Sequence, residues 1–258
     1  MPRYFLEVCY NGAPYSGFQL QENANTIQRE IETVLVTRFR KALAEAGMGR
    51  FKLTGSSRTD AGVHALQNYF HFDAPFDITA QHVYSLNAML PPPIAIVGIY
   101  PLPAGAHCRF DAVSREYKYI VYQHKNPFLA GRGYYYPYPT DVARLNELAA
   151  LVLGQQDFTS FSKRNTEVKT FICTVKHSAW AAQDGCLAYH VTGNRFLRGM
   201  VRGLVGTMLK VSKLPNAVET FKGIIAAQDC TLVDFAVPGD GLFLMSVNYP
   251  DGFFSQQP

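Results

Sequence analysis

The alternation of apolar and polar positions along the first part of the chain predicts strands and helices in turn. Tyr4, Leu6 and Val8 alternate as in a half-buried strand, and the apolar residues between Ile27 and Leu35 follow the spacing of one helix face. The expected strands are 3–10, 50–55, 66–73 and 94–100, and the expected helices are 26–46 and 79–90. This is the β-α-β-β-α-β order of the ferredoxin-like fold.

Local signals mark the ends of these helices. Asn25 and Gln28 are the expected capping pair of the first helix, and Gly47 is its expected stop. The second helix is expected to end at the three prolines 91–93, because proline cannot continue a helix.

The second half follows a similar order of elements without any repeat of residues. Its expected strands are 115–122, 170–182, 186–193 and 241–249, and its expected helices are 141–153, 195–213 and 217–227. Asp184-Gly185, between two of these strands, is typical of a tight hairpin. The pattern therefore predicts an α+β protein of two ferredoxin-like (RRM-like) halves, residues 1–106 and 107–258, with antiparallel sheets flanking a central cleft.

Composition narrows the class of protein. The chain is 48% hydrophobic with a net charge of +4, so it is globular and mildly basic, although basic residues gather between Arg29 and Arg58. The five cysteines form no C-x-x-C pair and the seven histidines no H-x-x-x-H spacing, so we expect neither disulfides nor a metal site. No G-x-G-x-x-G or Walker loop is present, so no nucleotide cofactor is expected. The chain start does not read as a signal peptide and no apolar run could span a membrane, which predicts a cytoplasmic protein.

One polar stretch, GSSRTDAGVHA at 55–65, lies between two expected strands and carries Arg58 and Asp60. Loops held by a rigid scaffold are where catalytic groups concentrate. Spacing alone leaves two interpretations open. Asp60 bonds its own backbone in a turn in which Gly62 supplies a positive φ, or its carboxylate is displayed for catalysis.

The segment RFLRGMVRGLVGTMLK has arginines and glycines at helical spacing, namely Arg195, Arg198, Arg202, Gly199, Gly203 and Gly206. Each glycine costs about 1 kcal/mol of helix propensity, which close approach of another backbone or a ligand would explain. The arginines are compatible with a solvated basic face, with pairing to a buried carboxylate, and with RNA contacts, for which Arg195 and Arg198 are the candidates.

Tyr117 and Tyr119 alternate with Glu116 and Lys118 on an expected strand. Two tyrosines on one strand face are usually packing residues, but they also form a platform on which a nucleic-acid base can stack. Both interpretations stay open at this point.

Taken together, the motifs resemble those of one family. The matching stretches are YNGAPYSGFQLQ (10–21), SRTDAGVHALQ (57–67), HCRFDAVSREYKYIVY (107–122), DFTSFS (157–162), GNRFLRGMVRGLVGTML (193–209) and PGDGLFLMSVNYP (238–250). In this order they are similar to the TruA-type tRNA pseudouridine synthases, nearly end to end. The resemblance implies isomerisation of uridine to pseudouridine at positions 38–40 of the tRNA anticodon stem-loop, by a homodimer that needs no metal or cofactor.

The resemblance also implies roles for four residues. Asp60 would be the catalytic nucleophile and Arg202 its basic partner, while Arg58 would handle the flipped-out nucleotide and Tyr117 would stack on the target base. The chain departs from the family pattern in small ways, for example at Ser57, where glycine usually precedes R-T-D-A-G, and at Asn11, where aspartate is usual.

Two other functions stay open from the sequence. One is a pseudouridine synthase acting on another RNA, and the other is a non-catalytic double RRM-like RNA-binding protein. The second lacks support, because no RNP-type aromatic pattern is present and a carboxylate loop has no use in it.

Overall fold

The computed structural model describes residues 1–164 and 168–255 of the 258-residue chain. These residues form a mixed α+β protein with two compact units, which are described one after the other. Unit 1 comprises Met1–Val113 together with the stretch from Leu244 onward, and unit 2 comprises Ser114–Phe243. No helix of the described residues is long and apolar enough to cross a membrane.

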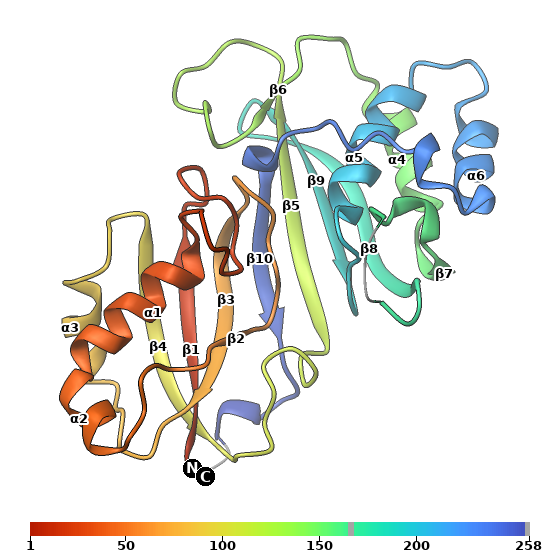
Figure 1. Cartoon of the computed structure of the whole chain (residues 1–258). Coiled ribbons are helices and arrows are strands. Elements are labelled where there is room, and N and C mark those ends of the chain that lie inside the picture. Colours follow the sequence, from red (N-terminus) through yellow and green to blue (C-terminus); the bar gives the residue numbers. More distant parts are fainter. Residues whose placement is uncertain (165–167, 256–258) are drawn as a thin grey trace. The chain divides into compact units, whose positions relative to one another are not determined.

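Unit 1 is built on a sheet in which β1 lies between β4 and β3, both antiparallel to it, and β10 follows β3 (Figure 1). A short strand, β2, also pairs with β3. The strands are β1 (Arg3–Tyr10), β2 (Thr54–Gly55), β3 (His64–Asp73), β4 (Ile94–Leu102) and β10 (Leu242–Asn248). The period-two pattern therefore predicted β1 correctly, whereas most of the expected strand 50–55 lies outside regular structure.

Three helices accompany this sheet: α1 (Ile27–Arg38), α2 (Arg40–Glu45) and α3 (His82–Asn87), with α1 in contact with α3 (Figure 1). The expected single helix 26–46 is interrupted at Phe39, which leaves helical geometry while its ring packs against Phe51 and Phe76. Gly47 ends the helical segment with a φ of +67°, as expected.

The expected capping pair of the first helix is wrong. Thr26 is the N-cap and accepts a hydrogen bond from the Arg29 amide at 3.3 Å. The side chain of Gln28 instead accepts a hydrogen bond from the Leu20 amide at 3.1 Å. The helix start is therefore capped by Thr26 and also tied to the preceding loop through Gln28.

Aromatic residues near the end of the chain cover the other face of the unit 1 sheet. Phe253 packs on Phe5 of β1 with ring centres 5.6 Å apart, and Phe254 packs on Tyr69 of β3 at 5.4 Å. Tyr249 contacts both sheet residues. Residues far apart in sequence therefore close the core of unit 1.

Unit 2 has a sheet of order β5-β9-β8-β7, antiparallel throughout, with β6 parallel to β5. The strands are β5 (Ser114–Tyr122), β6 (Tyr134–Tyr135), β7 (Gly154–Asp157), β8 (Ile172–Gln183) and β9 (Cys186–Gly193). Asp184 and Gly185 both have positive φ, at 51° and 72°, which confirms the tight hairpin.

The helices of unit 2 are α4 (Val142–Ala150), α5 (Met200–Val211) and α6 (Ala217–Ala227), which contact one another, and α4 also packs on β8. The expected helix 195–213 is wrong at its start, because Gly199 adopts a left-handed φ of +75° and helix α5 begins only at Met200. Arg195 and Arg198 therefore do not share a helical stripe with Arg202.

Candidate active site

The loop 55–65, here called the carboxylate loop, joins β2 to β3 and is held by the chain segment that follows β1. The amide of Phe18 donates to the carbonyl of Thr59 at 3.1 Å, and the amide of Gly62 donates to the carbonyl of Tyr15 at 3.3 Å. Backbone hydrogen bonds on both sides of residue 60 therefore fix the position of the loop.

Glycines make this close contact possible. A Cβ on Gly12 would lie 2.0 Å from the carbonyl oxygen of Val63, so no other residue fits there without moving the loop. Gly17, with a φ of +106°, approaches the carbonyl of Thr59 in the same way. The first sequence motif, 10–21, therefore acts as a support for the carboxylate loop.

Buried Asn68 of β3 organises the first part of the carboxylate loop. Its amide nitrogen donates to the carbonyl of Ser57 and to the hydroxyl of Tyr10, both at 3.1 Å, and its oxygen accepts from the hydroxyl of Ser56 at 2.7 Å. Sequence reasoning missed this role, although a buried amide in an apolar strand is itself a signal. The Ser57 hydroxyl is buried and has no hydrogen-bond partner within the described residues.

At the top of the loop, the carbonyl of Asp60 accepts a hydrogen bond from the Val63 amide at 3.3 Å, and Gly62 has a φ of +79°. A turn with the expected positive φ at Gly62 is therefore present, and the hydrogen bond from Val63 is accepted by the Asp60 backbone carbonyl. The Asp60 side chain is half-buried. Arg58 is exposed, and its side chain forms no hydrogen bond or ion pair within the part of the chain described, so its guanidinium is available to an anionic ligand.

In unit 2, Tyr117 of β5 is buried edge-on against Phe196, with ring centres 5.1 Å apart and planes at 82°. Gly193 leaves room for the Phe196 ring, since a Cβ there would lie 3.1 Å from it. Arg115, also buried, donates to the carbonyl of Asn194 at 2.9 Å and holds the same turn. The G-N-R-F motif therefore fixes the orientation of the Tyr117 ring.

Tyr119, the second tyrosine of the strand, is a packing residue. It is fully buried and its hydroxyl donates to the carbonyl of Pro238 at 2.8 Å. Burial raises its pKa far above the usual range of a tyrosine. Its place in the core holds the strand that carries Tyr117 in position.

Arg202 of α5 is anchored by a neighbouring backbone segment, residues 233–237. Its Nε donates to the carbonyl of Val237 at 2.8 Å, and one terminal nitrogen donates to the carbonyl of Phe235 at 3.4 Å. A Cβ on Gly206 would lie 2.4 Å from the carbonyl oxygen of Asp234. The close approach of another backbone, expected from the glycine spacing, is therefore confirmed.

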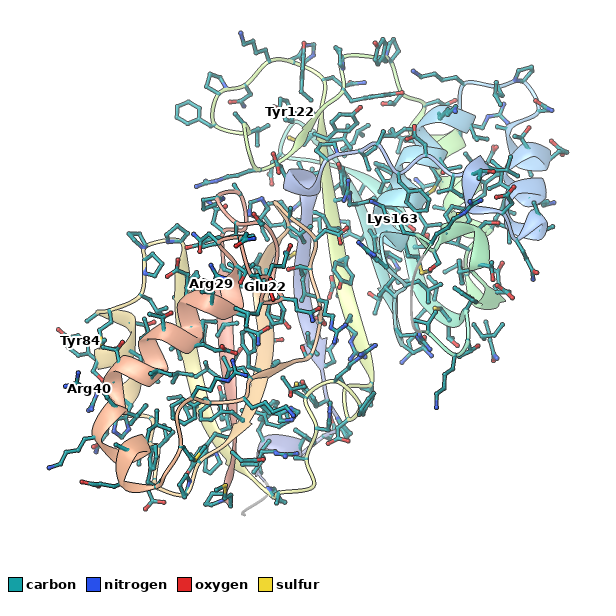
Figure 2. All side chains as sticks on the ribbon, in the orientation of Figure 1. Glu22, Arg29, Arg40, Tyr84, Tyr122 and Lys163 are labelled. Carbon is teal, nitrogen blue, oxygen red and sulfur yellow. The ribbon has the colours of Figure 1, made fainter. Side chains whose placement is uncertain are left out.

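Lys163 is a cation that sequence reasoning missed. Its amide donates to the carbonyl of Arg198 at 3.0 Å, its stem runs along Gly199, and its Nζ lies 5.7 Å from the Phe235 ring centre (Figure 2). Arg198 itself is exposed and Arg195 is half-buried. Three basic residues thus gather around the turn that precedes α5.

The D-F-T-S-F-S motif has a structural part to play. The hydroxyl of Ser160 donates to the carbonyl of Ile224 at 2.6 Å and accepts from the amide of Asp229 at 3.0 Å. Phe161 is fully buried and packs near Phe221. The motif therefore docks α6 and the chain after it.

The basic residues of unit 1 divide into two kinds. Arg29 donates to the backbone carbonyls of Gln21 and Glu22, and thereby orders the loop before α1 (Figure 2). Others are exposed to solvent, namely Arg40, Lys41, Arg50, Lys52 and Arg58. The second group supplies positive charge to an anionic partner.

The structure thus places Asp60 and Arg58 on one loop of unit 1, and Tyr117 and Arg202 in unit 2. The Asp60 carboxylate is half-buried on a loop that backbone bonds hold, and the chain also fixes a guanidinium and a tyrosine ring. Side chains of these types can serve in nucleophilic or electrostatic catalysis.

Comparison with known proteins identifies the kind of enzyme. The model of the tRNA pseudouridine synthase family matches residues 148–250. Over 98% of this chain and 98% of the relative, the sequence is 38% identical to tRNA pseudouridine synthase A of Parabacteroides distasonis. It is 39% identical to the protein of that name from Porphyromonas gingivalis, over 98% of this chain and all of the relative. The Staphylococcus aureus protein is 34% identical over 95% of this chain and 90% of its own length.

The chain therefore belongs to the tRNA pseudouridine synthase family, and the enzymes of this family are isomerases.

Proposed function

We propose that this protein isomerises uridine to pseudouridine at positions 38–40 of the tRNA anticodon stem-loop. The observation that carries the proposal is identity of 34–39% to tRNA pseudouridine synthase A proteins over nearly the whole chain. The supported carboxylate loop, which displays Asp60, is what such a reaction requires.

The reaction explains the set of side chains. The N1–C1′ bond of uridine breaks, the uracil turns, and C5 bonds to C1′, while C5 releases its proton to solvent and N1 gains a proton. Atoms and electrons balance without an oxidant, reductant or water, so the chemistry calls for no cofactor and no metal. A target base in a stem must first leave its stack, which costs a few kcal/mol and needs a pocket to receive it.

Four residues take the roles that this reaction needs. Asp60 attacks the target nucleotide or stabilises the positive charge that develops on its sugar. Arg202 keeps that carboxylate ionised, and its two carbonyl contacts hold the guanidinium in one orientation. Exposed Arg58 contacts the phosphate of the flipped nucleotide, and Tyr117 stacks on its base.

The RNA extends over the basic residues. Arg195 and Arg198, before α5, contact the phosphate backbone, as do the exposed basic residues of unit 1. Two subunits acting as a homodimer divide the length of a tRNA between them. Binding should weaken steeply as salt is raised, since phosphate neutralisation releases counterions, and sedimentation at micromolar protein should give a dimer. An active monomer would disprove the dimer.

The fold of this enzyme is best described as two ferredoxin-like halves, residues 1–106 and 107–258, that flank a cleft. Support comes from the chain order β1-α1-β2-β3-α3-β4 and from the position of β1 between β4 and β3. An enzyme of this kind meets its tRNA in the cytoplasm, where we place it.

Asp60→Asn tests the function most directly, with Asp77→Asn as a matched control at an exposed aspartate of unit 1. Asparagine keeps the shape of aspartate and removes only the charge. Tritium release from tRNA labelled at uracil C5 measures turnover, because C5 loses its hydrogen when it bonds to the sugar. Asp60→Asn should lose turnover and keep tRNA binding within a few-fold, whereas Asp77→Asn should behave like the unmodified protein.

Turnover by Asp60→Asn at the control rate would remove Asp60 from the mechanism. The substrate has its own test, in which pseudouridines are mapped in RNA from cells without this protein. Loss confined to positions 38–40 of tRNA supports the proposal. Loss in another RNA identifies a synthase of different substrate, and no loss at all favours the non-catalytic RNA-binding alternative.

A further inference from the structure

Three side chains able to bind a metal meet in unit 1, beside the strand that precedes the carboxylate loop. They are His71 of β3 and the neighbours His107 and Cys108. One ring nitrogen of each histidine and the Cys108 sulfur all lie within 4.8 Å of one another. His71 lies seven residues along β3 from His64, so roughly 20 Å of strand separates the cluster from the end of the carboxylate loop.

Hydrogen bonds orient the two buried members of the cluster. Nδ1 of His71 lies 3.1 Å from the Cys108 sulfur and accepts the Cys108 amide at 3.2 Å, so this nitrogen carries a lone pair on the side of the thiol. The thiol also reaches the carbonyl of Thr54 of β2 at 3.1 Å. The Nδ1 of His71 and the sulfur of Cys108 are therefore already close enough to bind one ion.

His107 completes the group from a half-buried position. Its Nδ1 accepts the amides of Arg109 and Phe110 at 3.1 and 3.4 Å, and water can take over these two bonds when the ring turns. Partial exposure of this ring gives an ion access to the buried pair.

The surrounding charges permit a cation. The guanidinium of Arg3, which acts on both histidines, is neutralised by both oxygens of Asp73, at 2.8 and 2.9 Å. The carboxylate of Asp111 accepts the His107 amide at 2.7 Å and adds negative charge beside the ring.

We propose that His71, His107 and Cys108 bind a zinc ion, with water as the fourth ligand. Nitrogen and thiolate ligands select zinc over magnesium or calcium. Tetrahedral zinc with bonds of about 2.0–2.3 Å sets its ligand atoms about 3.3–3.8 Å apart, so side-chain movements of roughly 1 Å close the site. The thiol proton passes to solvent as the metal binds.

Such an ion has a structural effect and no part in the isomerisation. It joins β3 to the chain that leads out of unit 1, and through the Thr54 contact it sits beside the strand from which the carboxylate loop departs. Removal of zinc should lower the melting temperature of the protein and leave turnover at moderate temperature unchanged.

The test uses the full chain, freed of metal by a chelator, and Co²⁺ as a spectroscopic probe. The protein should develop a thiolate-to-cobalt charge-transfer absorption that saturates at one ion per chain and disappears when Zn²⁺ is added. Cys173→Ser is the matched control, since this buried cysteine lies in unit 2. Cys173→Ser should keep the absorption and Cys108→Ser should lose it.

Removal of a direct ligand should weaken zinc binding by more than the roughly 10–100-fold that loss of an outer partner costs. No absorption in the unmodified protein, or equal absorption in Cys108→Ser, would overturn the site. If Cys108→Ser does not fold, His107→Asn at the half-exposed position decides. A loss of zinc affinity of more than about 100-fold then supports the proposal, and a smaller loss or an unchanged affinity refutes His107 as a ligand.

Discussion

Replacement of Gly206 by alanine tests how Arg202 is held. The new Cβ would lie 2.4 Å from the carbonyl oxygen of Asp234 and 3.2 Å from a methyl group of Val237. Carbon and oxygen need about 3.4 Å, so the 233–237 segment must move by roughly 1 Å. Because Arg202 donates to two carbonyls of that segment, its guanidinium loses its fixed position.

The stability change can be divided into two terms. Overpacking against backbone costs about 1–3 kcal/mol, while alanine in a helix gains about 1 kcal/mol over glycine. Gly206→Ala should therefore lower the free energy of unfolding by about 0–2 kcal/mol. Each kcal/mol lowers the melting temperature by roughly 2–4 °C. Gly223→Ala is the matched control, because Gly223 lies in α6 and a Cβ added there would meet no atom of the described residues within 4 Å. This control should gain about 1 kcal/mol.

Thermal unfolding measures the change in stability, and tritium release measures the change in turnover. If Arg202 has the role proposed above, Gly206→Ala should lose kcat at least tenfold while tRNA binding changes little, since that role concerns the carboxylate and not the phosphates. Gly223→Ala should retain kcat. Equal stabilisation of both variants with full activity would refute the argument that the 233–237 backbone positions Arg202.

Further predictions concern the loop and the base. Ser57→Ala should raise the free energy of unfolding by about 1 kcal/mol, because it removes a buried hydroxyl that has no partner among the described residues. Ser56→Ala should lower the free energy of unfolding by about 1–3 kcal/mol, since Asn68 loses a hydrogen bond. Urea unfolding of the two variants distinguishes these outcomes. In a binding titration, Tyr117→Phe should keep the affinity for tRNA. Tyr117→Ala should lose part of the stacking free energy, which is about 1–3 kcal/mol per base. Unchanged affinity in the alanine variant would make Tyr117 a packing residue only. Turnover in excess EDTA should equal that without it, and a metal requirement beyond tRNA folding would contradict the proposed chemistry.

Much of the fold could be predicted because many strand and turn signals lie within a few neighbouring residues. β1 and the Asp184-Gly185 hairpin follow directly from alternation and from residues that accept positive φ. The helix 195–213 was extended too far because arginine spacing does not show that Gly199 turns left-handed against Lys163, which depends on contacts between distant segments. The expected cap, Asn25, lies one residue before the observed N-cap, Thr26.

The site was predictable only as far as its motifs are contiguous. Arg58 and Asp60 lie on one loop, as their spacing indicated. The part played by Asn68 and the meeting of His71 with Cys108 depend on how β3 pairs and on which distant segment lies beside it, and no spacing rule contains that information. Pairwise motif searches for metals therefore overlook such a cluster.

Unit 1 is discontinuous in the sequence, and this has a consequence for its synthesis. Most of β10, the strand beside β3, and the aromatic cap of Tyr249, Phe253 and Phe254 are made only after unit 2. Until the ribosome releases them, the edge of β3 and the rings of Phe5 and Tyr69 stay uncovered, so a nascent chain carries its carboxylate loop on an unfinished scaffold. Translation that stops near residue 243 would therefore yield an aggregation-prone fragment rather than a smaller enzyme, because the residues from Leu244 onward complete the core of unit 1.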